Sequence, residues 1–236
     1  MSFVQRVREV GGLNLADAPR APLNPVAALP AMIPLIEHKS ARQKPLNFPI
    51  VTLLLHKLID FDKRVLRYTD REELAAQFGI APNARIIVSG VGRDVKIERY
   101  WGLPNREEVL AGLRELDIAL ITTPNYSVLS DVPRTDNLHA MKRIMLTFSE
   151  MARAGLPTAL HVNARTERDY QRWADVIGER EEVQCLAFEF ATGAGRGTRI
   201  EWHVERLQQL AITIGRPIRL VLRGGHRVLE ELRQSF

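Results

Sequence analysis

Ile86–Gly90 (IIVSG) is the first of five short apolar runs that end in glycine or in polar residues. Each run is followed by a segment whose apolar residues recur at helical spacing; the other four runs are Ile118–Thr123, Thr158–Asn163, Leu186–Ala191 and Ile218–Arg223. This alternation of strand and helix predicts an α/β fold with a parallel sheet and alternating helices. Sites in such folds lie beyond the carboxyl ends of the strands, so the last residues of each run are where chemistry is expected.

Two further apolar runs, Ile33–His38 and Val51–His56, bring the number of expected strands to seven. Eight strands complete a (β/α)₈ barrel, which usually has about 250 residues, and this chain has 236. We therefore expect a TIM-barrel-like, incomplete barrel, with an open doubly wound sheet as the alternative.

The first 47 residues differ from the rest of the chain by their six prolines and by a basic run, His38–Lys44. Proline fixes φ and removes a backbone donor. We therefore expect residues 1–47 to form an extended arm and residues 48–236 to form a single α/β domain. Such an arm could wrap the domain, close a barrel or bind a partner protein.

Composition excludes several classes of site. Cys185 is the only cysteine, which excludes an internal disulfide and a zinc or iron–sulfur site built from cysteines, and we expect it to be a small buried apolar residue. The start of the chain lacks the apolar segment of a signal peptide, and no apolar stretch approaches the length of a membrane span, so we expect a cytoplasmic protein without a membrane partner. The net charge of +5 permits binding of an anionic small molecule or of nucleic acid.

Several polar residues stand where helices should begin. Asp70, Asn105 and Thr166 precede apolar residues at helical spacing and are predicted N-caps, and Asp136 is predicted to open a longer helix.

Alternation along the late strands places ionisable residues on one face. His161 and Asn163 share a face of their run, Glu189 faces away from Leu186 and Phe188, and Arg223 faces away from Leu222. A buried carboxylate needs a partner, so Glu189 should pair with Arg223 or His161. A structural Glu–Arg bridge is one interpretation; the other is an active site in which Glu189 and His161 transfer protons.

A metal site is the third possibility for these residues. His161, Glu189 and His226 could together bind a divalent ion, but no HExxH-type spacing supports this, and we predict no metal.

Three loops rich in glycine follow predicted strands: Ser89–Asp94, Gly193–Gly197 and Arg223–His226. Backbone amides in such loops can hold phosphate, whereas the alternative is that the glycines make tight turns. The chain has neither a dinucleotide fingerprint nor a P-loop lysine motif. The residues predicted to bind substrate are Asn125, Asn163, Arg223, Gly224, Gly225 and His226.

The segment Thr122–Arg134 (TTPNYSVLSDVPR) is polar and loop-like where a strand should lead into a helix. This segment resembles an uncharacterised family of bacterial and phage proteins, and the resemblance covers Asp117–Asn163. The positions that carry it are Asn125, Tyr126, Ser127, Asp131 and Pro133. The resemblance implies a strand, a site loop with an Asp-x-Pro motif, a helix and a second strand, and it implies no established activity.

These observations predict an α/β-barrel-like enzyme that acts on a phosphorylated or nucleotide-like substrate by hydrolysis or group transfer. Arg223 and the amides of Gly224 and Gly225 would hold an anion, and Asn125 and Asn163 would orient the substrate. The alternatives are a noncatalytic subunit that binds nucleic acid or a partner through its basic arm and surface, and a degenerate barrel retained as a scaffold. The sequence indicates no particular cofactor.

Overall fold

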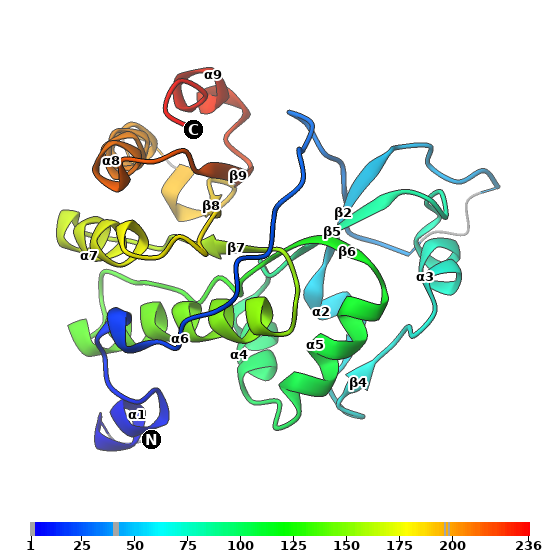
Figure 1. Ribbon diagram of the computed structural model, residues 1–236, viewed down its shortest axis with the longest axis horizontal. Helices are drawn as coiled ribbons and strands as arrows, with labels where there is room; N and C mark the ends of the chain where they lie inside the picture. Colours follow the sequence, from blue (N-terminus) through cyan, green and yellow to red (C-terminus); the bar gives the residue numbers. More distant parts are fainter. Residues whose placement is uncertain (1–2, 40–42, 196, 198) are drawn as a thin grey trace. The chain divides into compact units, whose positions relative to one another are not determined.

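A computed structural model describes residues 3–39, 43–195, 197 and 199–236 of the chain (Figure 1). Contacts divide the chain into two compact units. Unit 1 contains the residues up to Leu23 together with Tyr126–Ser149 and Ala159–Phe236, and unit 2 contains Asn24–Asn125 and Glu150–Thr158.

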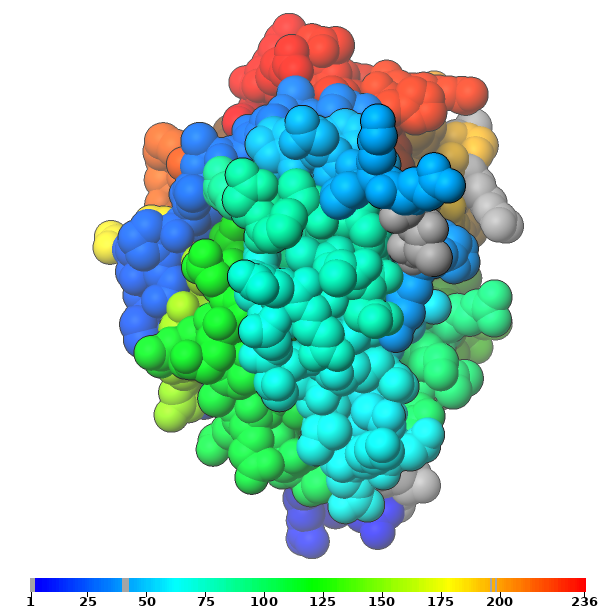
Figure 2. Space-filling model, turned by 90° about the vertical axis from the view of Figure 1, so that its right-hand side faces the viewer, coloured from blue at the N-terminus to red at the C-terminus, as the bar shows by residue number. Residues whose placement is uncertain are grey.

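Unit 2 contains four parallel strands whose order in the sheet follows the chain: β1 (Leu35–Ile36), β2 (Ile50–Leu54), β5 (Arg85–Ser89) and β6 (Ile118–Thr122). Its helices are α2 (Leu55–Leu58), α3 (Arg71–Phe78), α4 (Asp94–Trp101) and α5 (Arg106–Glu115). A hairpin of β3 (Ile59–Asp60) and β4 (Val65–Leu66) precedes α3. Figure 2 faces this unit, and the cyan part of the surface belongs to the hairpin and α3.

The core of unit 2 explains why these runs form strands. Val51, Leu53, Ile86 and Val88 are fully buried and pack with Leu113 of α5 in one apolar cluster. Strands buried in this way read as almost continuous apolar sequence, which is what the IIVSG run shows.

Unit 1 contains three parallel strands, again in chain order: β7 (Thr158–His161), β8 (Cys185–Glu189) and β9 (Arg219–Arg223). Helices α7 (Glu167–Gly178) and α8 (Arg199–Ile214) pack against each other on one flank of these strands (Figure 1). The long helix α6 (Arg134–Arg153) belongs mostly to this unit. The short helical elements are α1 (Phe3–Glu9), η1 (Leu15–Asp17), η2 (Gly193–Gly195), η3 (His226–Val228) and α9 (Leu229–Leu232).

The predicted α/β class, with parallel strands and alternating helices in the manner of an incomplete barrel, is confirmed. A doubly wound sheet reverses its strand order at a switch point. In both units the order follows the chain, as it does in a barrel.

Two predicted strands are shorter than expected. The run Val51–His56 ends as a strand at Leu54, because the next four residues form a helical turn that buries Leu55 and Leu58. Only Leu35–Ile36 of the run Ile33–His38 pairs with β2, directly after Pro34, which lacks a backbone donor.

The predicted caps differ in how they act. Asp70 accepts a hydrogen bond from the N–H of Glu73 at 2.8 Å, and Thr166 forms a reciprocal capping box with Asp169. Asn105 does precede α5, but its side chain caps no N–H of that helix. Its amide instead donates to the carbonyl of Arg64 and to the Glu108 carboxylate.

Replacing Asp70 by alanine should lower the free energy of unfolding by about 1 kcal/mol, because the N–H of Glu73 loses its acceptor. Urea unfolding of the wild type, Asp70→Ala and Asn105→Ala measures this. Asn105→Ala is the matched control at the same position of α5 and should cost less than half as much. Equal losses in the two variants would show that the cap is not the cause.

The sequence predicted an extended amino-terminal arm. In the structure the arm is not extended throughout. Residues Phe3–Glu9 form α1, in a stretch that precedes the first proline. The basic run His38–Lys44 lies partly outside the described residues.

The arm packs on unit 1 through polar contacts. Glu9 faces His139 of α6 at 3.0 Å, and Lys142 of α6 donates to the carbonyl of Asn14 at 2.5 Å. Arg180, which follows α7, donates to the carbonyl of Ala16 at 2.9 Å. Residues 3–20 therefore wrap their own unit, which is one of the three roles that the sequence left open for the arm.

Candidate functional site

Backbone register places Glu189 at the same level as Arg223 on the neighbouring strand, and His161 at the same level as Ala187. On β8 the face opposite to Glu189 carries Phe188, whose ring lies 5.4 Å from the ring of His203 on α8. This opposite face therefore points toward the helices. Glu189 and Arg223 therefore share the face turned away from α8, at the carboxyl ends of β8 and β9, as predicted.

Glu189 is the most unusual of these groups. It is only 4% exposed. One carboxylate oxygen accepts the N–H of Ala191 at 3.1 Å, and the other lies 3.8 Å from Nε of Arg223, which is too far for a hydrogen bond. Within the described part of the chain this second oxygen accepts no hydrogen bond. Of the two partners expected from the sequence, Arg223 is the one that forms the ion pair.

Burial raises the pKa of the Glu189 carboxyl, while the charge of Arg223 and the N–H of Ala191 act in the opposite direction. The net effect is upward, because the two partners compensate only part of the lost hydration. A carboxyl with a raised pKa holds its proton at higher pH than an exposed one, and can therefore donate it to a substrate.

His161 is more deeply enclosed than its strand-end position suggested. It is 1% exposed, and burial lowers its pKa to about 3. An imidazole with this pKa is neutral at physiological pH and accepts a proton poorly. The register places His161 level with Ala187, two residues before Glu189, and its burial makes it a weak candidate for proton transfer.

Asn163 is hydrogen-bonded to the loop that begins at Tyr126. Its side-chain amide donates to the carbonyl of Tyr126 at 2.7 Å, and its own carbonyl accepts the indole N–H of Trp173 at 2.8 Å. Arg165, two residues further on, donates from Nε to the carbonyl of Val128 at 2.6 Å. The segment after Tyr126, which the sequence singled out as a site loop, is thus tied to the carboxyl end of β7.

The side chains of that loop are divided between the core and solvent. Tyr126 is buried, with the guanidinium of Arg143 stacked 4.1 Å from its ring centroid, whereas Ser127 and Asp131 are exposed. Asn125 belongs to unit 2, where its N–H points to the carbonyl of Gly90 at 3.4 Å.

The glycines after β9 are explained by packing. Gly224 and Gly225 both have φ near +70°, a left-handed conformation that side chains disfavour. A Cβ on Gly224 would lie 2.7 Å from the backbone nitrogen of Ala191, and one on Gly225 would lie 2.8 Å from the ring of Phe190. Tight turns against the end of β8 therefore account for both residues, as the alternative interpretation of these loops predicted.

Close packing also explains glycines in the other two glycine-rich loops. A Cβ on Gly195 would lie 1.8 Å from the carbonyl oxygen of Phe190. In unit 2 a Cβ on Gly90 would lie 2.4 Å from the carbonyl oxygen of Thr123. At both positions the backbone of a neighbouring segment approaches too closely for a side chain, so glycine is required. Arg196 of the Gly193–Gly197 loop lies outside the described residues.

His226 is exposed at the start of η3. Among the described residues no three His, Cys, Asp or Glu side chains gather closely enough to hold a metal ion. The set His161, Glu189 and His226 is therefore not assembled. Cys185 is buried, and burial raises the pKa of its thiol to about 12, which agrees with the inert role expected of it.

Sequence reasoning missed two arginines near this site. Burial and the charges of Arg165 and Arg199 lower the pKa of His203 to about 4. Arg165 follows β7 and its guanidinium lies against Gly193 in the loop after β8, and Arg199 is the first residue of α8. Each arginine follows a predicted strand. Arg199 comes more than thirty positions after Arg165, and no sequence spacing rule relates the two residues.

Comparison with family models, with curated proteins and with solved structures found no match for this chain. The resemblance over Asp117–Asn163 therefore stays a prediction. None of the described helices is both long enough and apolar enough to cross a bilayer.

Proposed function

We propose that the protein is an enzyme that acts on a phosphorylated or nucleotide-like substrate by hydrolysis or group transfer, with Glu189 as the proton-transfer group. The observation that carries this proposal is the Glu189 carboxyl. It is buried at the carboxyl end of β8, has one oxygen fixed by a backbone N–H, and has a second oxygen 3.8 Å from a guanidinium and without a hydrogen bond.

The arrangement suits a general acid. A protonated Glu189 would give its proton to the leaving oxygen of the substrate as the bond from that oxygen to phosphorus breaks. The attacking water or acceptor hydroxyl forms the new bond to phosphorus, and its proton returns to the carboxylate. Arg223 would stabilise the carboxylate between these two transfers, because its charge lies on the same face at the same register.

His161 takes a different part in this proposal from the one that its sequence position suggested. Its pKa of about 3 keeps the ring neutral, so the proton transfer falls to Glu189 alone. His161 is buried, and its backbone is level with Ala187 on the neighbouring strand.

Replacing Glu189 by glutamine tests the proposal. Thermal-shift screening with nucleoside phosphates and a short single-stranded oligonucleotide first identifies a ligand, and phosphate release from that ligand is then followed by phosphorus NMR. Glu189→Gln should lower turnover by about a hundredfold or more, because it keeps the shape of the side chain and removes its proton chemistry. The fold should change little in this variant.

Glu205→Gln is the matched control, since Glu205 is an exposed carboxylate on α8 in the same unit. It should retain wild-type turnover. Wild-type turnover in Glu189→Gln would refute the proposal. Stabilisation by the oligonucleotide alone, lost steeply as salt rises, would instead support the alternative of a nucleic-acid-binding subunit.

A further inference from the structure

Arg165, in the turn between β7 and α7, contacts two loops that lie far from it in the sequence. Its Nε donates to the carbonyl of Val128 at 2.6 Å, across a separation of 37 residues. Its two terminal nitrogens lie 3.6 and 4.0 Å from the point where a Cβ on Gly193 would stand. A single side chain therefore lies between the loop that begins at Tyr126 and the loop that follows β8.

The backbone of Arg165 is held at the start of α7. Its N–H donates to the buried carboxylate of Asp169 at 3.0 Å, and Asp169 also forms the capping box with Thr166. The same carboxylate pairs with Arg134, the first residue of α6. The side chain of Arg165 thus leaves a fixed point of the fold. The hydrogen bond from Nε to Val128 then fixes the plane of the guanidinium, because this group is flat and rigid.

The loop after β8 contains the backbone group that holds Glu189. The N–H of Ala191 donates to one carboxylate oxygen of Glu189 at 3.1 Å. The turn after β9 packs against this N–H, because a Cβ on Gly224 would lie 2.7 Å from the Ala191 nitrogen. Arg165 contacts the same loop at Gly193. Backbone from the end of β9 and a side chain from the end of β7 therefore both bear on the loop that fixes the carboxyl.

The loop has little of its own to hold it in place. Gly193–Gly195 form the three-residue turn η2, and none of the three is buried. The turn is closed by the N–H of Gly195, which donates to the carbonyl of Thr192 at 3.0 Å. A loop with few buried contacts opens easily, and glycine adds backbone freedom. The position of this loop therefore depends on the groups that pack against it, and the Arg165 guanidinium is one of them.

We propose that Arg165 is a positioning residue for Glu189: by holding the loop after β8, it keeps the N–H of Ala191 on the Glu189 carboxylate. An N–H that donates to a carboxylate stabilises its charged form, so the position of this N–H influences how readily Glu189 releases its proton. Arg165 acts only through the loop. The catalytic consequence rests on the proposed function, whereas the positioning concerns groups of this chain alone.

Amide hydrogen exchange, measured residue by residue by NMR, tests the positioning without a substrate. In Arg165→Gln and in Arg165→Lys, the N–H of Ala191 should exchange about tenfold faster than in the wild type, because the loop opens more often. The lysine variant keeps the charge. Its single ammonium group cannot both donate to the carbonyl of Val128 and lie against Gly193, so lysine should not restore the wild-type exchange.

Titration of the Glu189 carboxyl by carbon NMR is the second readout. Burial raises the pKa of this carboxyl, and the charge of Arg223 and the N–H of Ala191 act against burial. A weakened contact with this N–H should therefore raise the pKa further in both Arg165 variants. A raised pKa in the glutamine variant alone would mean that Arg165 acts by its charge, and would overturn the proposal.

An amide in the interior of the sheet serves as the reference for overall stability. The N–H of Val162 donates to the carbonyl of Ala187 at 2.9 Å. It should exchange as in the wild type in both Arg165 variants. Equally accelerated exchange of Val162 and Ala191 would assign the effect to a general loss of stability, and would contradict the positioning role.

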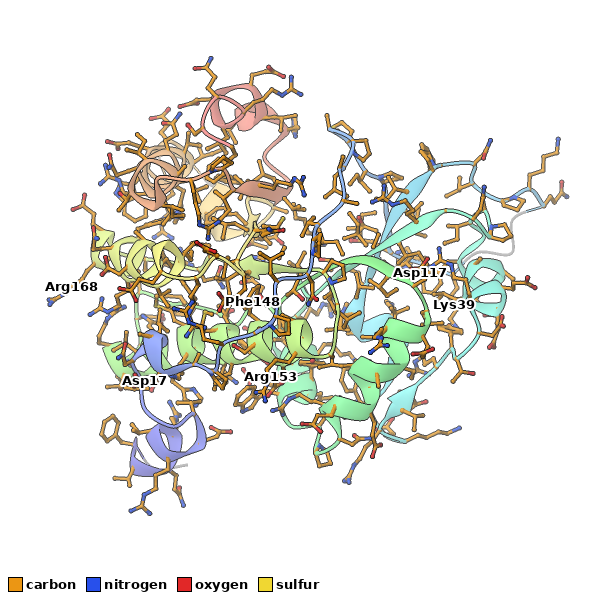
Figure 3. The ribbon with its side chains drawn as sticks, in the orientation of Figure 1. Asp17, Lys39, Asp117, Phe148, Arg153 and Arg168 are labelled. Atoms are coloured by element: carbon orange, nitrogen blue, oxygen red, sulfur yellow. The ribbon has the colours of Figure 1, made fainter. Side chains whose placement is uncertain are left out.

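Arg168→Gln is the matched control. Figure 3 shows Arg168 at the start of α7 with its side chain directed away from the unit, and it is exposed. This variant should leave both the exchange of Ala191 and the pKa of Glu189 unchanged. Equal effects of Arg165→Gln and Arg168→Gln, or wild-type exchange of Ala191 in Arg165→Lys, would overturn the proposal.

Turnover separates this inference from the proposed function. With a substrate identified, Arg165→Lys should lower kcat about tenfold and leave KM nearly unchanged, because the group that it positions acts in the proton transfer. If both NMR readouts change as stated while Glu189→Gln keeps wild-type turnover, Arg165 positions the carboxyl and the proposed function is wrong. If neither readout changes while turnover still requires Glu189, the positioning is wrong and the proposed function stands.

Discussion

Replacing Arg180 by alanine should lower the free energy of unfolding by about 3–5 kcal/mol, the usual cost of removing one partner of a buried charged network. The side chain is 3% exposed. Its guanidinium donates to the carbonyls of Ala16, Ala18 and Pro19 at 2.9, 2.5 and 3.2 Å and pairs with Glu182 at 3.3 Å. The carbonyls of Ala16 and Ala18 would lose this donor, and the amino-terminal segment, residues 3–20, would lose its contact with the residue that follows the end of α7.

Urea unfolding measures the loss, and limited trypsin digestion shows its location. In Arg180→Ala the bond after Arg8 should be cut earlier than in the wild type, because the released segment becomes accessible. Arg20→Ala is the control: it removes the same charge from a side chain that is 60% exposed and should cost less than about 1 kcal/mol. A similar cost for the two variants would mean that Arg180 does not anchor the segment.

Lowering the pH from about 7.5 to about 5 should destabilise the protein by about 2 kcal/mol for each of His161 and His203, or about 4 kcal/mol together. Burial lowers the pKa of His161 to about 3, and burial with Arg165 and Arg199 lowers that of His203 to about 4. Both histidines have an ordinary pKa of 6.5. In this pH interval they take up protons only when the chain unfolds. The contribution of the two histidines to the free energy of unfolding is complete above pH 6.5 and decreases as the pH falls toward the folded pKa values.

Urea unfolding at the two pH values tests this in the wild type and in the double variant His161→Gln, His203→Gln. The double variant should lose about 4 kcal/mol less over the interval, since glutamine does not titrate. His226→Gln serves as control, because His226 is exposed. A pH dependence unchanged in the double variant would contradict the assignment.

The sequence was sufficient for the strands and for the faces that their residues occupy. The period-two pattern of β8 predicted correctly that Phe188 packs toward α8 and that Glu189 faces the other way, next to Arg223. Such patterns work because strand geometry alone decides which residues share a face. Strand ends were less accurate, as in β2, where the helical turn from Leu55 to Leu58 depends on the burial of both leucines.

The sequence was not sufficient for features that depend on distant parts of the chain. The burial of His161 depends on how neighbouring elements cover its strand, and the role of Asn163 depends on the carbonyl of Tyr126, 37 residues away. The glycines were ambiguous because a tight turn and a phosphate loop use the same residue type.

The docking of the amino-terminal segment also has a consequence for synthesis of the protein. Asn14 meets Lys142 across 128 residues, and Ala18 meets Arg180 across 162 residues. The ribosome makes residues 14–18 before Lys142 and Arg180, and Arg180 leaves the exit tunnel only after a further stretch of chain has been made. Residues 14–18 therefore remain undocked until Arg180 has emerged, and chaperones or proteases that bind exposed chain have that interval in which to act on them.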